Sequence, residues 1–196
     1  DYDLEKVNCL VIWGCDPLSS NRQVPNTIHR FGEIMARGTV IAVDPRLSVS
    51  ASKAHEWLPL LPGTDGALAG AVAHVLLTEG LWSKEFVGDF KDGRNQFVAG
   101  RAVDEASFAE KETNGVVKWW NLEVKDRTPA WAEKECGVPA AQIVRAARAM
   151  GKAAPRTAVW MGPGAAMQPR GTYSAMYVHA LNGLLGSVDN EGGVWQ

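Results

Sequence analysis

Two short apolar runs, separated by an amphipathic stretch, constrain the fold of this chain more than any other feature. Residues 7–13 and 39–44 have the near-continuous apolar composition of strands in a parallel sheet that is covered on both faces. Between them, residues 26–37 have the apolar spacing of a helix that ends at Gly38. Two parallel strands need such a crossover, which is almost always right-handed. The sequence therefore predicts an α/β fold with three layers, α/β/α, around a mostly parallel, doubly wound sheet.

The remaining segments continue this pattern along the chain. Residues 57–61 and 157–161 are short apolar runs with the length of further strands. Residues 88–127 are charged and interrupted by glycine, and we expect a variable insertion of loops with a short hairpin or a short helix there. The predicted domains are residues 1–152, which include this insertion, and residues 153–196. The predicted helices span residues 66–79, 84–87, 128–137, 139–150 (ended by Gly151) and 172–185.

Composition and charge exclude several classes of partner. The chain has 196 residues and a formal net charge of −2 without a basic run, so we expect no binding to nucleic acid. No apolar stretch reaches about eighteen residues, so we expect no direct insertion into a membrane. The cysteines form no C-x-x-C pair and the histidines are scattered, which predicts no metal ligand in this segment. No G-x-S-x-G or H-E-x-x-H motif is present, and no catalytic residue is assigned.

Two aspartates stand at predicted element boundaries, about twenty residues apart. Asp44 ends a strand and is followed by Pro45 and Arg46, and Asp65 opens the next long helix. An acid at the end of a strand binds a ribose or a base in doubly wound folds, and a guanidinium offers paired donors to phosphate. Asp65 could accept the N1–H and the exocyclic amine of a guanine. Both sites also have structural interpretations, a surface Asp–Arg pair and an acidic helix start.

Two glycine-containing turns follow predicted strands, where ligands of open α/β sheets bind. In the first turn, residues 13–17, Gly14 allows a ligand to approach the backbone, and serine hydroxyls follow. The second turn, residues 161–164, has neither the G-x-G-x-x-G spacing nor the lysine of a P-loop. Either turn can also be an ordinary strand–helix connection. Cys15 is open to two interpretations, a nucleophile activated at a helix N-terminus or a small loop residue.

Four segments occur in an order that is specific when they are taken together: WGCDPLSSNRQ, VIAVDPRLSVSA, WLPLLPGTDGALAGAVAHVLLTEGL and AVWMGPGAAMQPRGT. In this order they resemble the molybdopterin oxidoreductase family, also called the dimethyl sulfoxide reductase family. The resemblance implies that residues 1–152 are a Rossmann-like segment that binds molybdopterin guanine dinucleotide. Residues 153–196 would belong to an adjacent or intertwined α/β domain. The implied cofactor-binding residues are Trp13, Gly14, Cys15, Asp16, Pro17, Ser19, Ser20, Asp44, Pro45, Arg46, Ser48, Gly63, Thr64, Asp65, Met161, Gly162, Gly164 and Gln168.

The resemblance also implies a parent catalytic subunit that holds two molybdopterin guanine dinucleotides around one molybdenum or tungsten atom. The family's cluster-binding cysteines, its metal-binding residue and its C-terminal domain have no counterpart here, so an iron–sulfur cluster is expected in the parent but not in this segment. We expect a fragment that is inactive alone and that works with the remainder of the parent subunit and an iron–sulfur electron-transfer subunit. The parent is expected in the periplasm or at the outer face of the cytoplasmic membrane.

Within the family, SSNRQVP and WWNLEVKDRTPAWA resemble the anaerobic respiratory reductases of arsenate, thiosulfate, polysulfide or tetrathionate. One alternative belongs to a different class. Because the segment has no catalytic group of its own, it could be a non-catalytic α/β module that binds a guanine nucleotide by itself. A third interpretation gives every motif a structural role only.

Overall fold

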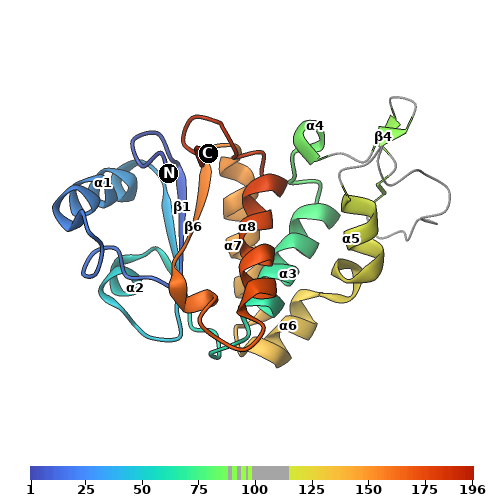
Figure 1. The fold of residues 1–196 in the computed structure, drawn as a ribbon, viewed down its shortest axis with the longest axis horizontal. Helices are drawn as coiled ribbons and strands as arrows, with labels where there is room; N and C mark the ends of the chain where they lie inside the picture. The colour runs from blue at the N-terminus through green and yellow to red at the C-terminus, as the bar shows by residue number, and fades with distance from the viewer. Residues whose placement is uncertain (88–89, 92–93, 96, 99–114) are drawn as a thin grey trace.

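The computed structural model describes residues 1–87, 90–91, 94–95, 97–98 and 115–196. Its main feature is a parallel β-sheet with helices packed against it (Figure 1). In these residues the main sheet has four strands in the order β3-β2-β1-β6, all of them parallel. Strand β1 lies between β2 and β6, so that Trp13 is opposite Val43 on one side and Met161 on the other. The strands are β1 (Cys9–Trp13), β2 (Thr39–Val43), β3 (Glu56–Leu58) and β6 (Thr157–Met161).

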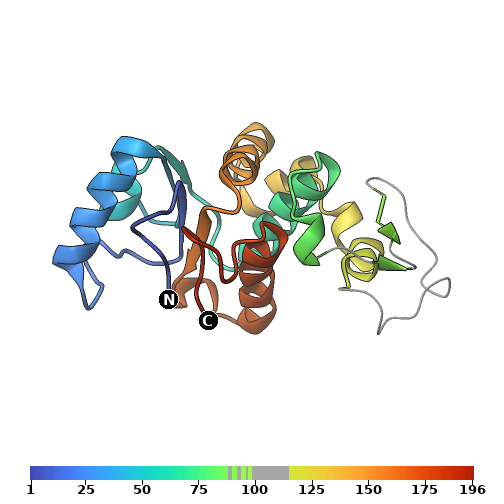
Figure 2. The same ribbon diagram turned by 90° about the horizontal axis from the view of Figure 1, so that it is seen from above.

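Helices cover both faces of the sheet, which confirms the predicted fold class (Figures 1 and 2). Helices α1 and α2 lie on one face, at the left of Figure 1. Helices α7 and α8 contact the strands from the other face, and α3 packs on both of them. Helices α6 and α5 lie farther from the sheet. The helices are α1 (Val24–Arg37), α2 (Val49–Lys53), α3 (Asp65–Thr78), α5 (Val116–Leu122), α6 (Pro129–Cys136), α7 (Ala140–Ala153) and α8 (Gly171–Leu184).

Alternation of side chains along β1 divides the core between the two faces of the sheet. Cys9, Val11 and Trp13 belong to the cluster that also contains side chains of α3, α7 and α8. Leu10 and Ile12 belong to a second cluster, with side chains of α1. The last side chain of β1, Trp13, therefore points toward the face on which α3 lies.

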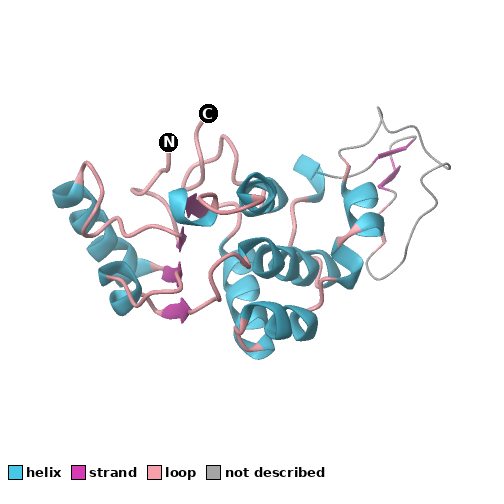
Figure 3. Cartoon of the chain, turned by 60° about the horizontal axis from the view of Figure 1, so that its bottom comes forward, coloured by secondary structure: helices cyan, strands magenta, loops and turns pink. Residues whose placement is uncertain are grey.

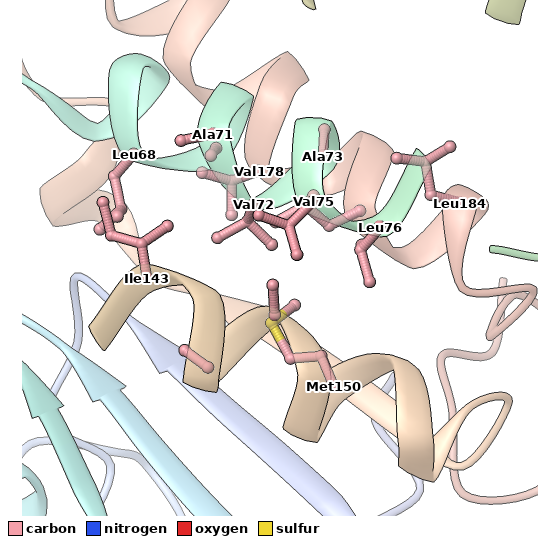
Figure 4. Close-up of a cluster of buried hydrophobic side chains, with 14 of the residues drawn as sticks. Leu68, Ala71, Val72, Ala73, Val75, Leu76, Ile143, Met150, Val178 and Leu184 are labelled. Atoms are coloured by element: carbon pink, nitrogen blue, oxygen red, sulfur yellow. The ribbon is translucent and has the colours of Figure 1, made fainter. Parts of the chain in front are cut away.

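The larger cluster encloses α3 (Figure 4). Leu76 of α3, Ile143 of α7 and Val178 of α8 are wholly buried in it. Apolar side chains surround α3 on several sides, which is typical of a helix inside a core rather than on a surface. Each buried side chain of this size contributes about 1.5–3 kcal/mol. This packing anchors α3, and its first residue, Asp65, is therefore held at a fixed position.

The predicted strands and helices are present, with shifted ends and two substantive differences. The predicted helix end at Gly151 is wrong, because α7 continues to Ala153. A Cβ at Gly151 would lie 2.6 Å from the Cβ of Leu81, so this glycine permits close packing inside a helix. Sequence reasoning also missed α2, whose five residues are too few to show a helical apolar pattern.

Much of the predicted insertion at residues 88–127 lies outside the described residues. Its described parts include a two-stranded antiparallel hairpin and α5 (Figure 3). The division of the chain after residue 152 stays a prediction, and β6, which lies beyond it, shares one sheet with β1. In the described part of the chain, no helix has the length and apolar character needed to cross a membrane. The short elements are α4 (Lys84–Val87), β4 (Phe90–Lys91), β5 (Arg94–Asn95), η3 (Val124–Asp126) and η4 (Pro163–Ala165).

Candidate functional site

The turns that follow β1 and β6 are joined through their backbones. The N–H of Gly162 donates to the carbonyl of Trp13 at 2.7 Å, and the N–H of Gly164 donates to the carbonyl of Gly14 at 3.1 Å. A Cβ on Gly14 would lie 2.7 Å from the nitrogen of Ala165, and Gly14 has a φ of +65° that favours glycine. These glycines therefore allow the two turns to approach each other, a role that the sequence did not reveal.

A cleft of about 810 Å³ opens beside the joined turns, beyond the carboxyl ends of the strands. Because the chain proceeds from β1 to β2 on one side and β6 pairs with β1 on the other, this is where a doubly wound sheet binds ligands. The predicted residues that line the cleft are Gly14, Cys15, Asp16, Ser20, Asp44, Pro45, Arg46, Gly63, Asp65, Gly164 and Gln168. The predicted residues that do not line it are Trp13, Pro17, Ser19, Ser48, Thr64, Met161 and Gly162.

Asp65 lies at the wall of the cleft with a hydrogen-bond donor on each carboxylate oxygen. The indole Nε1 of Trp13 donates to Oδ1 at 2.7 Å, and Nε2 of Gln168 donates to Oδ2 at 3.1 Å. The same Gln168 nitrogen also donates to the carbonyl of Ala165 at 3.0 Å. Trp13 is 1% exposed and Asp65 is 6% exposed, so this contact is shielded from water.

The environment of Asp65 changes its acidity in two opposing directions. Burial raises the pKa of Asp65 above its ordinary value, and it is the largest effect. Hydrogen bonds from Trp13 and Gln168 favour the charged form and lower the pKa, and the charge of Asp44 raises it again. The net result is a carboxyl group that takes up a proton at a higher pH than an ordinary aspartate does.

Asp16 joins the turn after β1 to the start of α2. Its Oδ1 accepts from the backbone N–H of Ser50 at 2.9 Å and from the Ser50 hydroxyl at 2.6 Å. Its Oδ2 accepts from the Ser19 hydroxyl at 2.6 Å and from the N–H of Val49 at 3.3 Å. The pairing of Asp16 with Ser50 was not predicted, because the two residues are 34 positions apart in the sequence. With these acceptor positions occupied, Asp16 can line the cleft but has little capacity left for a ligand.

Asp44 and Arg46 present an acceptor and a cation to the same cleft. The Asp44 carboxylate accepts from the N–H of Arg46 at 2.8 Å, and its carbonyl accepts from Nε1 of Trp57 at 2.8 Å. The Arg46 side chain is 73% exposed and its Nη2 lies 4.0 Å from Asp16. An exposed guanidinium in this position is available to an anion. Ser48, in contrast, accepts from the N–H of Ala51 and caps α2.

The remaining predicted residues have less chemical capacity. The pKa of Cys15 is raised to about 12, mainly by burial and further by the charges of Asp44 and Asp16. A thiol of this kind is protonated at neutral pH, which favours the interpretation of Cys15 as a small loop residue. The Thr64 hydroxyl donates to the carbonyl of Leu61 and makes no side-chain cap for α3. Among the described residues, no group of three or more His, Cys, Asp or Glu side chains could hold a metal ion.

Comparison with known proteins identifies the family. The family model described as molybdopterin oxidoreductase matches residues 1–196, and the chain belongs to this family. The chain is 61% identical over 194 residues to the arsenate respiratory reductase molybdopterin-containing subunit ArrA of Chrysiogenes arsenatis, covering 99% of this chain and 23% of that protein. It is 33% identical over 195 residues to the thiosulfate reductase molybdopterin-containing subunit PhsA of Salmonella typhimurium, covering 99% of this chain and 22% of that protein.

A solved structure, acetylene hydratase from Pelobacter acetylenicus, has the same fold. It matches with a TM-score of 0.75 and 23% identity, covering 97% of this chain and 23% of that protein. At this identity the likeness concerns the fold alone. The chain thus spans less than a quarter of the length of the relatives and of this structural neighbour.

Membership in the family implies a molybdopterin cofactor with molybdenum or tungsten. The cleft fits a group that carries both N–H donors and anionic oxygens, because it offers the carboxylates of Asp44 and Asp65 together with the guanidinium of Arg46. Its volume of about 810 Å³ is within the range of cofactor sites.

Proposed function

We propose that this chain is the guanine-dinucleotide-binding segment of the catalytic subunit of a molybdenum or tungsten oxidoreductase that reduces an arsenic or sulfur oxyanion. One observation carries the proposal. Asp44 and Arg46, from the connection between β2 and α2, and Asp65, from the start of α3, line a single cleft beyond the carboxyl ends of the parallel strands. The identity of 61% to the ArrA subunit makes arsenate the first substrate to test.

In this proposal three polar side chains of the cleft bind separate parts of the nucleotide. Asp44 accepts hydroxyl protons of the ribose, and Arg46 binds the diphosphate with its exposed guanidinium. Asp65 accepts the N1–H and the exocyclic amine of the guanine. The loop of Gly164 and Gln168 closes the cleft from the side of β6. The bound group supplies the redox chemistry, and the residues of this chain hold and orient it.

The partners follow from the same proposal. The remainder of the parent subunit would supply the ligand of the metal, a second dinucleotide site and an iron–sulfur cluster, and a separate iron–sulfur subunit would exchange electrons with it. We expect the 196-residue chain alone to show no reductase activity.

The site assignment is tested in the parent subunit with Asp44→Ala and Asp65→Ala. Guanine nucleotide released by denaturation is measured per subunit, and each variant is expected to carry much less of it than the wild type. Glu85→Ala is the matched control, because it removes a carboxylate from the exposed surface of α4. Wild-type guanine content in both cleft variants would show that the assignment is wrong.

Titration of the 196-residue chain with GDP separates the proposal from the alternative of a self-sufficient nucleotide-binding module. The proposal expects no tight binding, because residues outside this segment complete the enclosure of the cofactor. Tight, stoichiometric binding of GDP by the isolated chain would favour the alternative.

The substrate is tested with the parent subunit and a reduced viologen dye. We expect arsenate to oxidise the dye faster than thiosulfate or tetrathionate does. Turnover with neither arsenic nor sulfur oxyanions would refute this part of the proposal and leave the cofactor assignment unaffected.

A further inference from the structure

Trp13 lies behind the cleft rather than in it. It does not line the cleft and is 1% exposed, although it was among the residues predicted to bind the cofactor. Its polar atom, Nε1, donates to Asp65 at 2.7 Å. We propose that Trp13 is a positioning residue, which orients the Asp65 carboxylate for guanine without touching the cofactor itself. This inference rests on the function proposed above.

The geometry of the carboxylate supports this role. Each oxygen of Asp65 accepts one hydrogen bond from another side chain, Oδ1 from Trp13 and Oδ2 from Gln168. A carboxylate oxygen has two lone pairs, so these two side-chain bonds leave acceptor capacity on the carboxylate. The N1–H and the 2-amino group of guanine are two roughly parallel donors, and they match a carboxylate whose plane is fixed. The two protein donors, Trp13 and Gln168, together fix the plane of the Asp65 carboxylate.

Trp13 is the more rigid of the two donors. It ends β1 and is hydrogen-bonded in register between Val43 and Met161, so its backbone cannot shift without disturbing the centre of the sheet. Gln168 stands in a loop and is only partly buried. The orientation of Asp65 therefore depends more on the core of the sheet than on the loop.

The hydrogen bond from Trp13 also has an electrostatic consequence. Burial raises the pKa of Asp65, and the bond from Trp13 opposes this by stabilising the charged form. Protonated Asp65 has lost one acceptor position, so guanine binding weakens as the pH falls through its pKa. Removal of the Trp13 N–H is expected to move this loss to higher pH.

Other titratable and charged groups share this environment and must stay unchanged in the test. Those that line the same cleft are Cys15, Asp16, Asp44 and Arg46. Those that line the neighbouring pocket, beyond Thr64, are Glu123, Arg127, Glu135, Arg170, Tyr173 and Tyr177. Asp44 is the one whose charge acts on the pKa of Asp65, and it acts equally in the wild type and in a Trp13 variant.

The test follows retention of guanine nucleotide by the cofactor-loaded parent subunit after dialysis between pH 5 and pH 8. Trp13→Phe removes the N–H donor, and we expect retention to fall about tenfold and its midpoint to move to higher pH. Trp160→Phe is the matched control, because it removes an indole from β6 that packs on Tyr2 in the other core cluster. If Trp13→Phe fails to assemble, 3-benzothienylalanine incorporated at position 13 keeps the bicyclic shape and lacks only the N–H.

Asp65→Asn separates failure of this inference from failure of the proposed function. If this variant retains guanine with the wild-type midpoint, Asp65 does not bind the base, and the role of Asp65 and the positioning role of Trp13 fail together. If Asp65→Asn loses guanine while the Trp13 variants keep the wild-type midpoint, the proposed function stands and the positioning role of Trp13 is overturned.

Discussion

Replacement of Asp16 by alanine is expected to destabilise the chain strongly, although Asp16 lines the candidate cleft. Its carboxylate accepts from the N–H and the hydroxyl of Ser50, which is wholly buried. A buried donor that loses its partner costs about 1–3 kcal/mol, so two such donors cost about 2–6 kcal/mol. The Ser19 hydroxyl and the N–H of Val49 lose the same acceptor but are less deeply placed. We expect a loss of about 3 kcal/mol, because a water molecule can enter the space vacated by the carboxylate.

Urea unfolding, followed by tryptophan fluorescence, measures this loss. Asp16→Ala should lower the urea midpoint without changing the dependence of the unfolding free energy on urea. The reason is that the wild type and the variant expose nearly the same additional surface when they unfold. Ser20→Ala is the matched control in the same turn, where an exposed hydroxyl donates to the Asp16 carbonyl at 3.0 Å. A loss below about 1 kcal/mol for Asp16→Ala, or one equal to that of Ser20→Ala, would refute the reasoning.

The pH dependence gives an independent check on the same residue. Burial alone would raise the pKa of Asp16, but hydrogen bonds from Ser19, Ser50 and Val49 outweigh it and hold the pKa below its ordinary value. A lowered pKa in the folded state contributes stability above about pH 4, and that contribution is lost as the pH falls through the folded value. The difference between wild type and Asp16→Ala should therefore shrink below about pH 4. A constant difference down to pH 2 would contradict a charged Asp16.

Gly162→Ala should destabilise the chain by at least about 2 kcal/mol in urea, since its Cβ would lie 2.2 Å from that of Cys15. Gly32→Ala should instead add about 0.5–1 kcal/mol, since nothing lies within 4 Å of its Cβ in α1; the opposite order of the two variants would refute the packing argument. Cys15, with a pKa of about 12, should resist iodoacetamide at pH 8 until urea unfolds the chain, which mass spectrometry detects. Arg148→Ala breaks an exposed bidentate pair with Glu79, at 2.8 Å for both bonds, and should cost less than about 1 kcal/mol, and less still in 1 M salt.

The sequence predicts the fold well in segments where almost every residue is buried and therefore apolar. The strands that became β1, β2 and β6 are almost wholly apolar because helices cover both faces of the sheet, and that pattern is visible without a structure. Gly151 misled the prediction because a glycine that ends a helix and a glycine that admits a neighbouring side chain look identical in sequence. The short helix α2 left no periodic signal, because five residues are too few for one, and its contact with Asp16 joins residues 34 positions apart.

The same distinction explains which site residues could be predicted. Asp44 and Asp65 were visible because each stands at an element boundary, which is a local property of the chain. The contacts that determine what these acids can do are not local. Trp13 reaches Asp65 across 52 positions and Gln168 reaches it across 103 positions. No spacing rule joins such pairs, because the sheet order β3-β2-β1-β6, and not sequence distance, determines which turns meet.

The junction between the two turns makes the cleft depend on segments on both sides of the predicted boundary at residue 152. Strand β6 lies at the end of the sheet order, and the side chain of Asn182 pairs with the backbone of Val159 in it, accepting from the N–H at 2.9 Å and donating to the carbonyl at 3.1 Å. This contact from α8 pairs backbone groups at the middle of an edge strand, which would otherwise be buried without a partner. Because β6 is thereby fixed beside β1, Gln168 is delivered to Asp65 by the loop that follows it. The carboxylate proposed to recognise guanine therefore receives one donor from each side of the predicted boundary, and the two sides can contribute to binding only as a folded unit.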